Sequence, residues 1–310
     1  MLEVTDLRKQ FKKTSAVDGV NLYLEQGEIV GLLGPNGAGK STTISMMSSL
    51  IKPTSGDVRF YNESIIKKPQ NLREQLGVVP QEIALYLELT ARENLLFFGK
   101  IYRLEKAQLQ RKIDEVLEII GLTEKQNDLV KTFSGGMKRR LNIGVALLHE
   151  PTIIFMDEPT VGIDPQSRNY ILETVKRLNR EKKITIVYTS HYMEEVEFLC
   201  DRIYIMDKGH IIASGTNEEI KSILSAEQTF VIETERVEPA FVEVLEENPV
   251  VNQISVKEKT LSIIVPRDVN FFQTIIEKAE ETNTPLLSVQ VQKPSLEDVF
   301  LHLTGRALRD

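Results

Sequence analysis

Apolar and polar residues follow two kinds of pattern along the first two thirds of the chain. Runs of apolar residues predict strands at residues 17–33, with a turn at Gln26-Gly27, and again at 152–156, 184–188 and 202–206. Apolar residues at helical spacing predict helices at 40–50 and 166–180, and a helical insert between residues 90 and 148. Strands that alternate with helices predict an α/β fold with a partly parallel sheet.

The pattern changes after Gly215. It predicts a strand, a helix, two strands, a helix and a strand, at residues 230–235, 239–247, 250–256, 260–265, 270–281 and 286–292. This order is typical of a small ferredoxin-like α+β domain. A last helix is expected at Ser295, because Ser295 and Asp298 have the spacing of a capping box. We therefore expect two domains, residues 1–215 with a helical subdomain at about 82–150, and residues 216–310.

The composition is ordinary for a globular protein, with 310 residues, 41% hydrophobic and 27% charged. No apolar run reaches the ~18–20 residues that span a bilayer, so we expect a chain that does not cross a membrane by itself. The first residues lack the pattern of a secretion signal. A single cysteine, Cys200, cannot form an internal disulfide and indicates a reducing compartment.

The net charge of −7 is concentrated near the C-terminus. Residues 222–310 contain 8 Lys+Arg and 15 Asp+Glu, whereas the rest of the chain contains 30 of each. Neither part has the basic surface that nucleic-acid binding requires, so we expect no nucleic-acid partner.

A glycine-rich loop lies between the apolar strand that ends at Leu33 and the next predicted helix. It matches the pattern GxxxxGKS, in which backbone N–H groups and a helix N-terminus bind phosphates. Lys40 is expected to neutralise the terminal phosphates, and the Ser41 hydroxyl to bind Mg²⁺. The residues of this loop expected to bind nucleotide are Gly34, Pro35, Asn36, Gly37, Ala38, Gly39, Lys40, Ser41 and Thr42.

Two carboxylates follow the strand predicted at 152–156. Asp157 is expected to reach the Mg²⁺ through water, and Glu158 to activate the attacking water as general base. A lone carboxylate at a strand end is more often a solvated loop residue. Glu158, however, directly follows Asp157, and this position favours a catalytic role for it.

Together with these motifs, Ser134-Gly135-Gly136 makes residues 1–215 resemble the ATP-binding subunits of ATP-binding-cassette (ABC) transporters. The resemblance implies a P-loop NTPase core of the ABC-cassette type that hydrolyses ATP with Mg²⁺. It implies that Ser134, Gly135 and Gly136 bind the γ-phosphate held by an opposite subunit, and that Asp164 lies in a loop crossing between subunits. A head-to-tail homodimer follows, with an integral membrane permease docked near residues 81–94.

The resemblance assigns roles to three further residues. Phe11 matches the aromatic residue that stacks on adenine, with a core phenylalanine as the alternative. Gln81 matches the glutamine that contacts Mg²⁺ and senses the membrane partner, and His191 the histidine that contacts the γ-phosphate. The remaining histidines are expected to be ordinary core or surface residues: His149, His210 and His302.

Two departures from the common family pattern point to one branch. Met137 stands where many members have Gln, and Val161-Gly162-Ile163 replaces a run of smaller residues. Both variants, with the C-terminal sequence KPSLEDVF at residues 293–300, resemble a bacterial export branch that includes drug and antibiotic resistance systems. The resemblance implies export of a small hydrophobic or amphipathic compound, powered from the cytoplasmic face of the membrane.

The sequence leaves two other functions to consider. Related soluble ATPases act in DNA repair or on ribosomes, but they carry a long coiled coil, zinc-binding cysteines or a second cassette, and this sequence has none of them. The acidic C-terminal domain could alternatively sense a ligand. It contains no recognisable site, so a dimer-stabilising or docking role is favoured.

Overall fold

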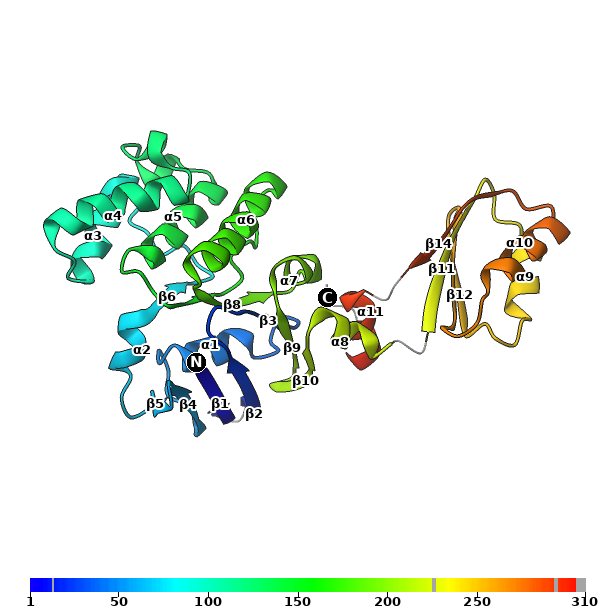
Figure 1. The fold of residues 1–310 in the computed structure, drawn as a ribbon, viewed down its shortest axis with the longest axis horizontal. Coiled ribbons are helices and arrows are strands. Elements are labelled where there is room, and N and C mark those ends of the chain that lie inside the picture. The colour runs from blue at the N-terminus through cyan, green and yellow to red at the C-terminus, as the bar shows by residue number, and fades with distance from the viewer. Residues whose placement is uncertain (13, 225–226, 293–294, 305–310) are drawn as a thin grey trace. The chain divides into compact units, whose positions relative to one another are not determined.

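The computed structural model describes residues 1–12, 14–224, 227–292 and 295–304, which fall into two compact units, one up to residue 217 and the other from residue 218 onward (Figure 1). Lys293 and Pro294, which belong to the C-terminal sequence resembling an export branch, lie outside the described residues. Within the described part of the chain, no helix is both long and apolar enough to cross a bilayer.

A six-stranded sheet forms the centre of the N-terminal unit (Figure 1). Its order is β10-β9-β3-β8-β7-β6, with five parallel strands and β10 antiparallel at one edge. Every residue of β3, β7 and β8 is buried, as expected for parallel strands covered on both faces. The strands are β3 (Ile29–Leu33), β6 (Leu76–Val79), β7 (Ile153–Met156), β8 (Thr185–Ser190), β9 (Arg202–Asp207) and β10 (His210–Gly215).

A second, antiparallel sheet packs in the same hydrophobic core, with the order β2-β1-β4-β5. Its strands are β1 (Leu2–Phe11), β2 (Thr14–Leu24), β4 (Ser55–Phe60) and β5 (Glu63–Ser64). The sequence analysis did not predict β1 or β4. In β1 the buried residues Leu2, Val4 and Leu7 do not keep a period of two, because the register shifts between Val4 and Leu7, where Asp6 has φ 46°.

The helices of the N-terminal unit include the expected helical insert, in which α3, α4 and α5 pack on one another (Figure 1). Thr90 begins α3 with a capping box formed with Glu93. The first helix ends at Met47, three residues earlier than predicted. The helices are α1 (Lys40–Met47), α2 (Gln70–Gln75), α3 (Ala91–Ile101), α4 (Lys106–Ile119), α5 (Gly135–Leu147), α6 (Pro165–Lys182) and α7 (Met193–Leu199), with short 3₁₀ turns at Thr123–Lys125 and Val130–Thr132.

The C-terminal unit contains one antiparallel sheet in the order β12-β13-β11-β14. Helix α9 supplies Phe241 and Leu245, and α10 with its N-cap residue supplies Ile275 and Phe271, to the core on one face of this sheet. The ferredoxin-like fold is confirmed, although β12 begins three residues later than predicted. The elements are α8 (Asn217–Ser222), β11 (Glu227–Thr234), α9 (Pro239–Glu246), β12 (Gln253–Lys257), β13 (Thr260–Pro266), α10 (Phe272–Glu281), β14 (Leu286–Gln292) and α11 (Leu296–Thr304).

The predicted capping box at the last helix is confirmed. The backbone N–H of Asp298 donates to Ser295 Oγ at 3.1 Å, and the backbone N–H of Ser295 donates to Asp298 Oδ2 at 2.7 Å. These two bonds satisfy backbone donors that a helix N-terminus otherwise leaves unpaired.

Candidate functional site

A cavity of about 390 Å³ lies at the carboxyl edge of the parallel strands, where the loop after β3 faces the end of β7. In parallel sheets the carboxyl ends of the strands meet at one edge, so residues distant in sequence converge there. The cavity is lined by Phe11, Ala16, Asn36, Gly37, Ala38, Gly39, Lys40, Ser41, Thr42, Gln81 and Glu158.

Two glycines of the phosphate loop occupy places that no other residue suits. Gly39, which begins α1, has φ 105°, in the region that favours glycine. A Cβ on Gly34 would lie 2.3 Å from the carbonyl oxygen of Met206. The loop therefore keeps its backbone close to the neighbouring strand and opens toward the cavity.

Lys40 and Glu158 form a buried ion pair at the bottom of the cavity. Their side chains are 4% and 5% exposed, and Lys40 Nζ lies 3.0 Å from Glu158 Oε1. The same ammonium donates to the carbonyl oxygens of Gly34 at 2.8 Å and Pro35 at 3.2 Å. Glu158 has φ 45°, a strained backbone for a residue with a side chain. Each buried charge is compensated by the other.

Gln81 and His191 approach the second oxygen of the same carboxylate. Gln81 Nε2 donates to Glu158 Oε2 at 3.4 Å, and His191 Nδ1 lies 3.4 Å from this oxygen. The structure thus brings together the three residues predicted to be catalytic, although they come from three separate segments. Glu158 is the point at which they meet.

Thr189 organises the predicted acidic pair, and the sequence analysis did not identify it. Its hydroxyl donates to Asp157 Oδ1 at 2.8 Å and accepts from the backbone N–H of Glu158 at 2.8 Å. Thr189 precedes His191 by two residues, and this proximity in sequence was the available signal. Its single hydroxyl fixes both carboxylate residues relative to β8.

Arg139 is a second residue that the sequence analysis missed. It lies on α5 and is buried, and its guanidinium donates to the carbonyl oxygens of Pro80 at 2.6 Å and Gln81 at 2.5 Å. Burial lowers the pKa of Arg139 from its ordinary value. The helix that begins at the Ser134 motif therefore also holds the backbone that carries Gln81.

The Ser134 motif and Asp164 stand apart from the cavity that holds Lys40 and Glu158. Ser134 caps α5 by accepting from the N–H of Met137, and Asp164 caps α6 by accepting from the N–H of Ser167. This hydrogen bond lowers the pKa of the Asp164 carboxyl. None of the four predicted residues of these two segments lines the cavity: Ser134, Gly135, Gly136 and Asp164.

Phe11 lines the cavity and is 47% exposed, so it is not a core residue. Lys9 Nζ lies 5.1 Å from the centre of its ring. The structure therefore places an exposed aromatic ring beside the phosphate loop.

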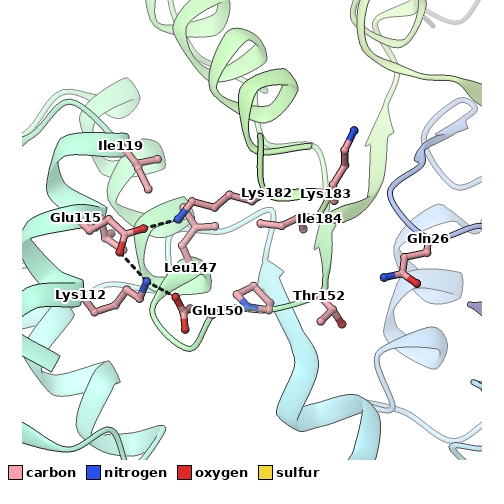
Figure 2. Close-up of a pocket in the computed structure, with 12 residues that line it drawn as sticks. Gln26, Lys112, Glu115, Ile119, Leu147, Glu150, Thr152, Lys182, Lys183 and Ile184 are labelled. Carbon is pink, nitrogen blue, oxygen red and sulfur yellow. Dashed lines mark hydrogen bonds and ion pairs between the residues drawn. The ribbon is translucent and has the colours of Figure 1, made fainter. Parts of the chain in front are cut away.

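The N-terminal unit has a second cavity, of about 410 Å³, near the start of β7 and β8 (Figure 2). Four charged residues at this cavity pair with one another, and we call them the distal ion cluster: Lys112, Glu115, Glu150 and Lys182. Lys112 Nζ lies 2.7 Å from Glu115 Oε2 and 2.5 Å from Glu150 Oε1, and Lys182 pairs with Glu115. Because these charges neutralise one another, we assign this cavity no ligand.

Comparison with known proteins identifies the family. The family model described as "ABC transporter" matches residues 17–161. The chain is 49% identical to the linearmycin resistance ATP-binding protein LnrL of Bacillus subtilis, over the whole of both chains. It is 32% identical to the daunorubicin resistance ATP-binding protein DrrA3 of Streptomyces coeruleorubidus, over 98% of this chain and 96% of that protein.

Among solved structures, the chain is similar to a dimeric ATP-binding cassette in a post-hydrolysis state, bound to ADP and Pi. The TM-score is 0.64 and the identity is 29%, over 70% of this chain and 98% of that structure. The similarity to the resistance proteins runs through both units, and Lys40 and Glu158 both line the cavity beside the phosphate loop. The chain therefore belongs to the ABC transporter family, as one of its ATP-binding, ATP-hydrolysing subunits.

Proposed function

We propose that this ATPase works as a head-to-tail homodimer with Mg²⁺ and powers export of an amphipathic antibiotic-like compound through a separate membrane permease. The observation that carries the proposal is the meeting of Lys40, Gln81 and His191 on the Glu158 carboxylate. In this arrangement Lys40 is the cation for the phosphate and Glu158 is the general base. Gln81 and His191 orient these two groups.

In the proposed reaction Lys40 binds the terminal phosphates, and Glu158 accepts a proton from the attacking water. His191 lies 3.4 Å from Glu158, close enough to contact the γ-phosphate beside the water. Phe11, at the rim, stacks on the adenine. Because Lys40 and Glu158 neutralise each other in the buried pair, an arriving phosphate competes with Glu158 for the ammonium and frees the carboxylate to act as base.

The residues near the cavity fit a Mg²⁺ ion held mainly by phosphate and water. Within the described residues, no three His, Cys, Asp or Glu side chains are grouped to hold a metal by themselves. Mg²⁺ commonly uses one or two protein oxygens and keeps several waters. The Ser41 hydroxyl, the Gln81 amide oxygen and the Asp157 carboxylate would hold it, and it would neutralise charge developing on the phosphates.

The dimer is supported by where the remaining predicted residues lie. Ser134, Gly135 and Gly136 do not line the cavity of their own chain, yet Ser134 begins a helix whose N-terminus suits a phosphate. A two-fold arrangement would bring this helix to the partner's ATP and complete two equal sites. The similar solved cassette, whose structure is described as dimeric, agrees with this arrangement.

An exposed apolar patch supports docking of a permease near Gln81. Tyr86, Leu87 and Phe97 are all exposed, and the rings of Tyr86 and Phe97 lie 4.7 Å apart between centres. Clustered exposed aromatic residues mark interaction surfaces. Binding there would link a membrane partner on the cytoplasmic face to Gln81, and the names of LnrL and DrrA3 support an antibiotic as cargo.

The variant Glu158→Gln tests the assignment of the general base. Loss of the base is expected to lower kcat for ATP hydrolysis about 10²- to 10⁴-fold. ATP should still bind, so the variant should accumulate as an ATP-bound dimer, measured by light scattering after size-exclusion chromatography.

Glu28→Gln is the matched control. Glu28 is largely buried and pairs with Arg202 at 2.9 Å, at the opposite end of β3. Glu158→Gln with normal turnover, or without an ATP-dependent dimer, would contradict the proposal.

The cargo is tested separately by exposing a strain that lacks this protein to linearmycin and daunorubicin. Reintroducing the protein should restore resistance, and this restoration must require an intact Glu158.

A further inference from the structure

A buried carboxylate that no motif predicted lies behind the proposed site. Glu195 of α7 is 2% exposed. Its Oε2 accepts hydrogen bonds from Thr160 Oγ1 at 2.8 Å, Tyr188 OH at 2.9 Å and Ser190 Oγ at 2.9 Å. Its other oxygen lies 3.5 Å from Arg168 Nε. A buried charge is retained only where such partners compensate its desolvation.

The partners of Glu195 belong to three segments that carry predicted site residues. Thr160 follows Glu158 by two residues, Ser190 directly precedes His191, and Arg168 lies in the first turns of α6, just after Asp164. One carboxylate therefore connects the strand end that holds the base, the turn that holds the histidine, and the helix start that holds Asp164.

The contact with the His191 turn is made through the Ser190 hydroxyl. Ser190 Oγ donates to Glu195 and also accepts from the backbone N–H of Tyr192 at 2.9 Å, so it closes the turn around His191. The rings of His191 and Tyr192 lie with centres 4.2 Å apart and planes tilted by 40°, and the Arg168 guanidinium lies 4.6 Å from the centre of the Tyr192 ring.

We infer that Glu195 is a positioning residue for ATP hydrolysis, holding the turn that carries His191 at its distance from Glu158. The inference rests on the proposed roles of His191 and Glu158. The competing explanation is that Glu195 only satisfies buried hydroxyls in the core. In that case its loss would lower stability without any special relation to His191.

A double-mutant cycle separates these explanations. Glu195→Gln keeps the shape but loses the charge that three hydroxyls and Arg168 share. It is expected to lower kcat about 10- to 100-fold, because small displacements of catalytic groups have effects of this size. KM for ATP should change by less than about 2-fold. In the His191→Ala background, Glu195→Gln should lower kcat further by less than about 2-fold, because the group that it positions is already absent.

Two more variants keep the test decisive. Ser190→Ala removes only the hydroxyl that links Glu195 to the His191 turn. It should also lower kcat, and this loss should disappear in the His191→Ala background. The variant therefore tests the inference even if Glu195→Gln folds poorly. Glu28→Gln, at another largely buried glutamate paired with an arginine, should leave kcat unchanged in both backgrounds.

The outcomes distinguish this inference from the proposed function. If His191→Ala lowers kcat but the effects of Glu195→Gln and Ser190→Ala multiply with it, Glu195 is only structural and the inference is overturned. If His191→Ala itself leaves kcat unchanged, the role proposed for His191 fails, and the inference fails with it.

Discussion

The two units of this protein differ in what they bury. Near the cavity beside the phosphate loop, the N-terminal unit buries four charged side chains, Lys40, Arg139, Glu158 and Glu195. In the described part of the C-terminal unit, the buried polar side chains are Thr234 and Thr284. The Thr234 hydroxyl donates to the carbonyl oxygen of Lys259, in the turn between β12 and β13, and the Thr284 hydroxyl pairs with that of Thr282.

This difference distinguishes an interior that only packs side chains from an interior that also holds charged groups. Burying a charge is unfavourable unless partners compensate it, so an interior with several charges requires a dedicated arrangement of donors and acceptors. The N-terminal unit has such an arrangement next to its phosphate loop. The core of the C-terminal unit is built from apolar side chains that hold its sheet and helices together.

The largest effect is expected when a buried charge of the N-terminal unit is removed. Lys40→Ala removes the cation proposed to bind the phosphates and leaves Glu158 buried without its partner. Turnover of ATP should fall at least about 10²-fold, the size of effect seen when one electrostatic contact to a reacting group is lost. Steady-state hydrolysis and ATP binding measure it. Normal affinity and turnover would show that the buried pair is not the phosphate site.

A smaller effect, on stability alone, is expected when an apolar side chain is removed from the core of the C-terminal unit. Phe241→Ala empties part of the C-terminal core and should lower the unfolding free energy of that unit by about 3–5 kcal/mol, without changing ATP affinity. Hydrogen exchange in β11 and β13 measures it. Phe272→Ala, at an exposed phenylalanine of the neighbouring helix, is the matched control. A loss of ATP affinity in Phe241→Ala alone would break the contrast between the units.

The smallest effect concerns charges that are paired but not buried. Lys182 of the distal ion cluster is 41% exposed and pairs with Glu115 (Figure 2). Lys182→Gln should lower the unfolding free energy by less than about 1 kcal/mol, since solvent screens exposed ion pairs. Chemical denaturation measures it. A change in ATP turnover comparable to that of Lys40→Ala would show that burial is not what distinguishes the catalytic pair.

Local sequence was sufficient for the features that depend on neighbouring residues. The phosphate loop requires glycines where φ is positive or a strand lies close, and the capping box at Ser295 needs only residues three apart. Element order in the C-terminal unit followed from short apolar patterns. Strand β1 was not predicted, because a shift of register at Asp6 interrupts the alternation of buried and exposed residues along it.

The sequence by itself determined the family resemblance, the α/β and ferredoxin-like folds, and the identity of the phosphate loop, because each depends on spacing along the chain. Only the tertiary structure decided that Gln81, Glu158 and His191 meet at one carboxylate, since the order of parallel strands brings their ends together. It also decided that Glu195 is buried among hydroxyls from separate segments. Desolvation and long-range hydrogen bonding depend on which segments pack together, and the local sequence pattern does not specify that packing.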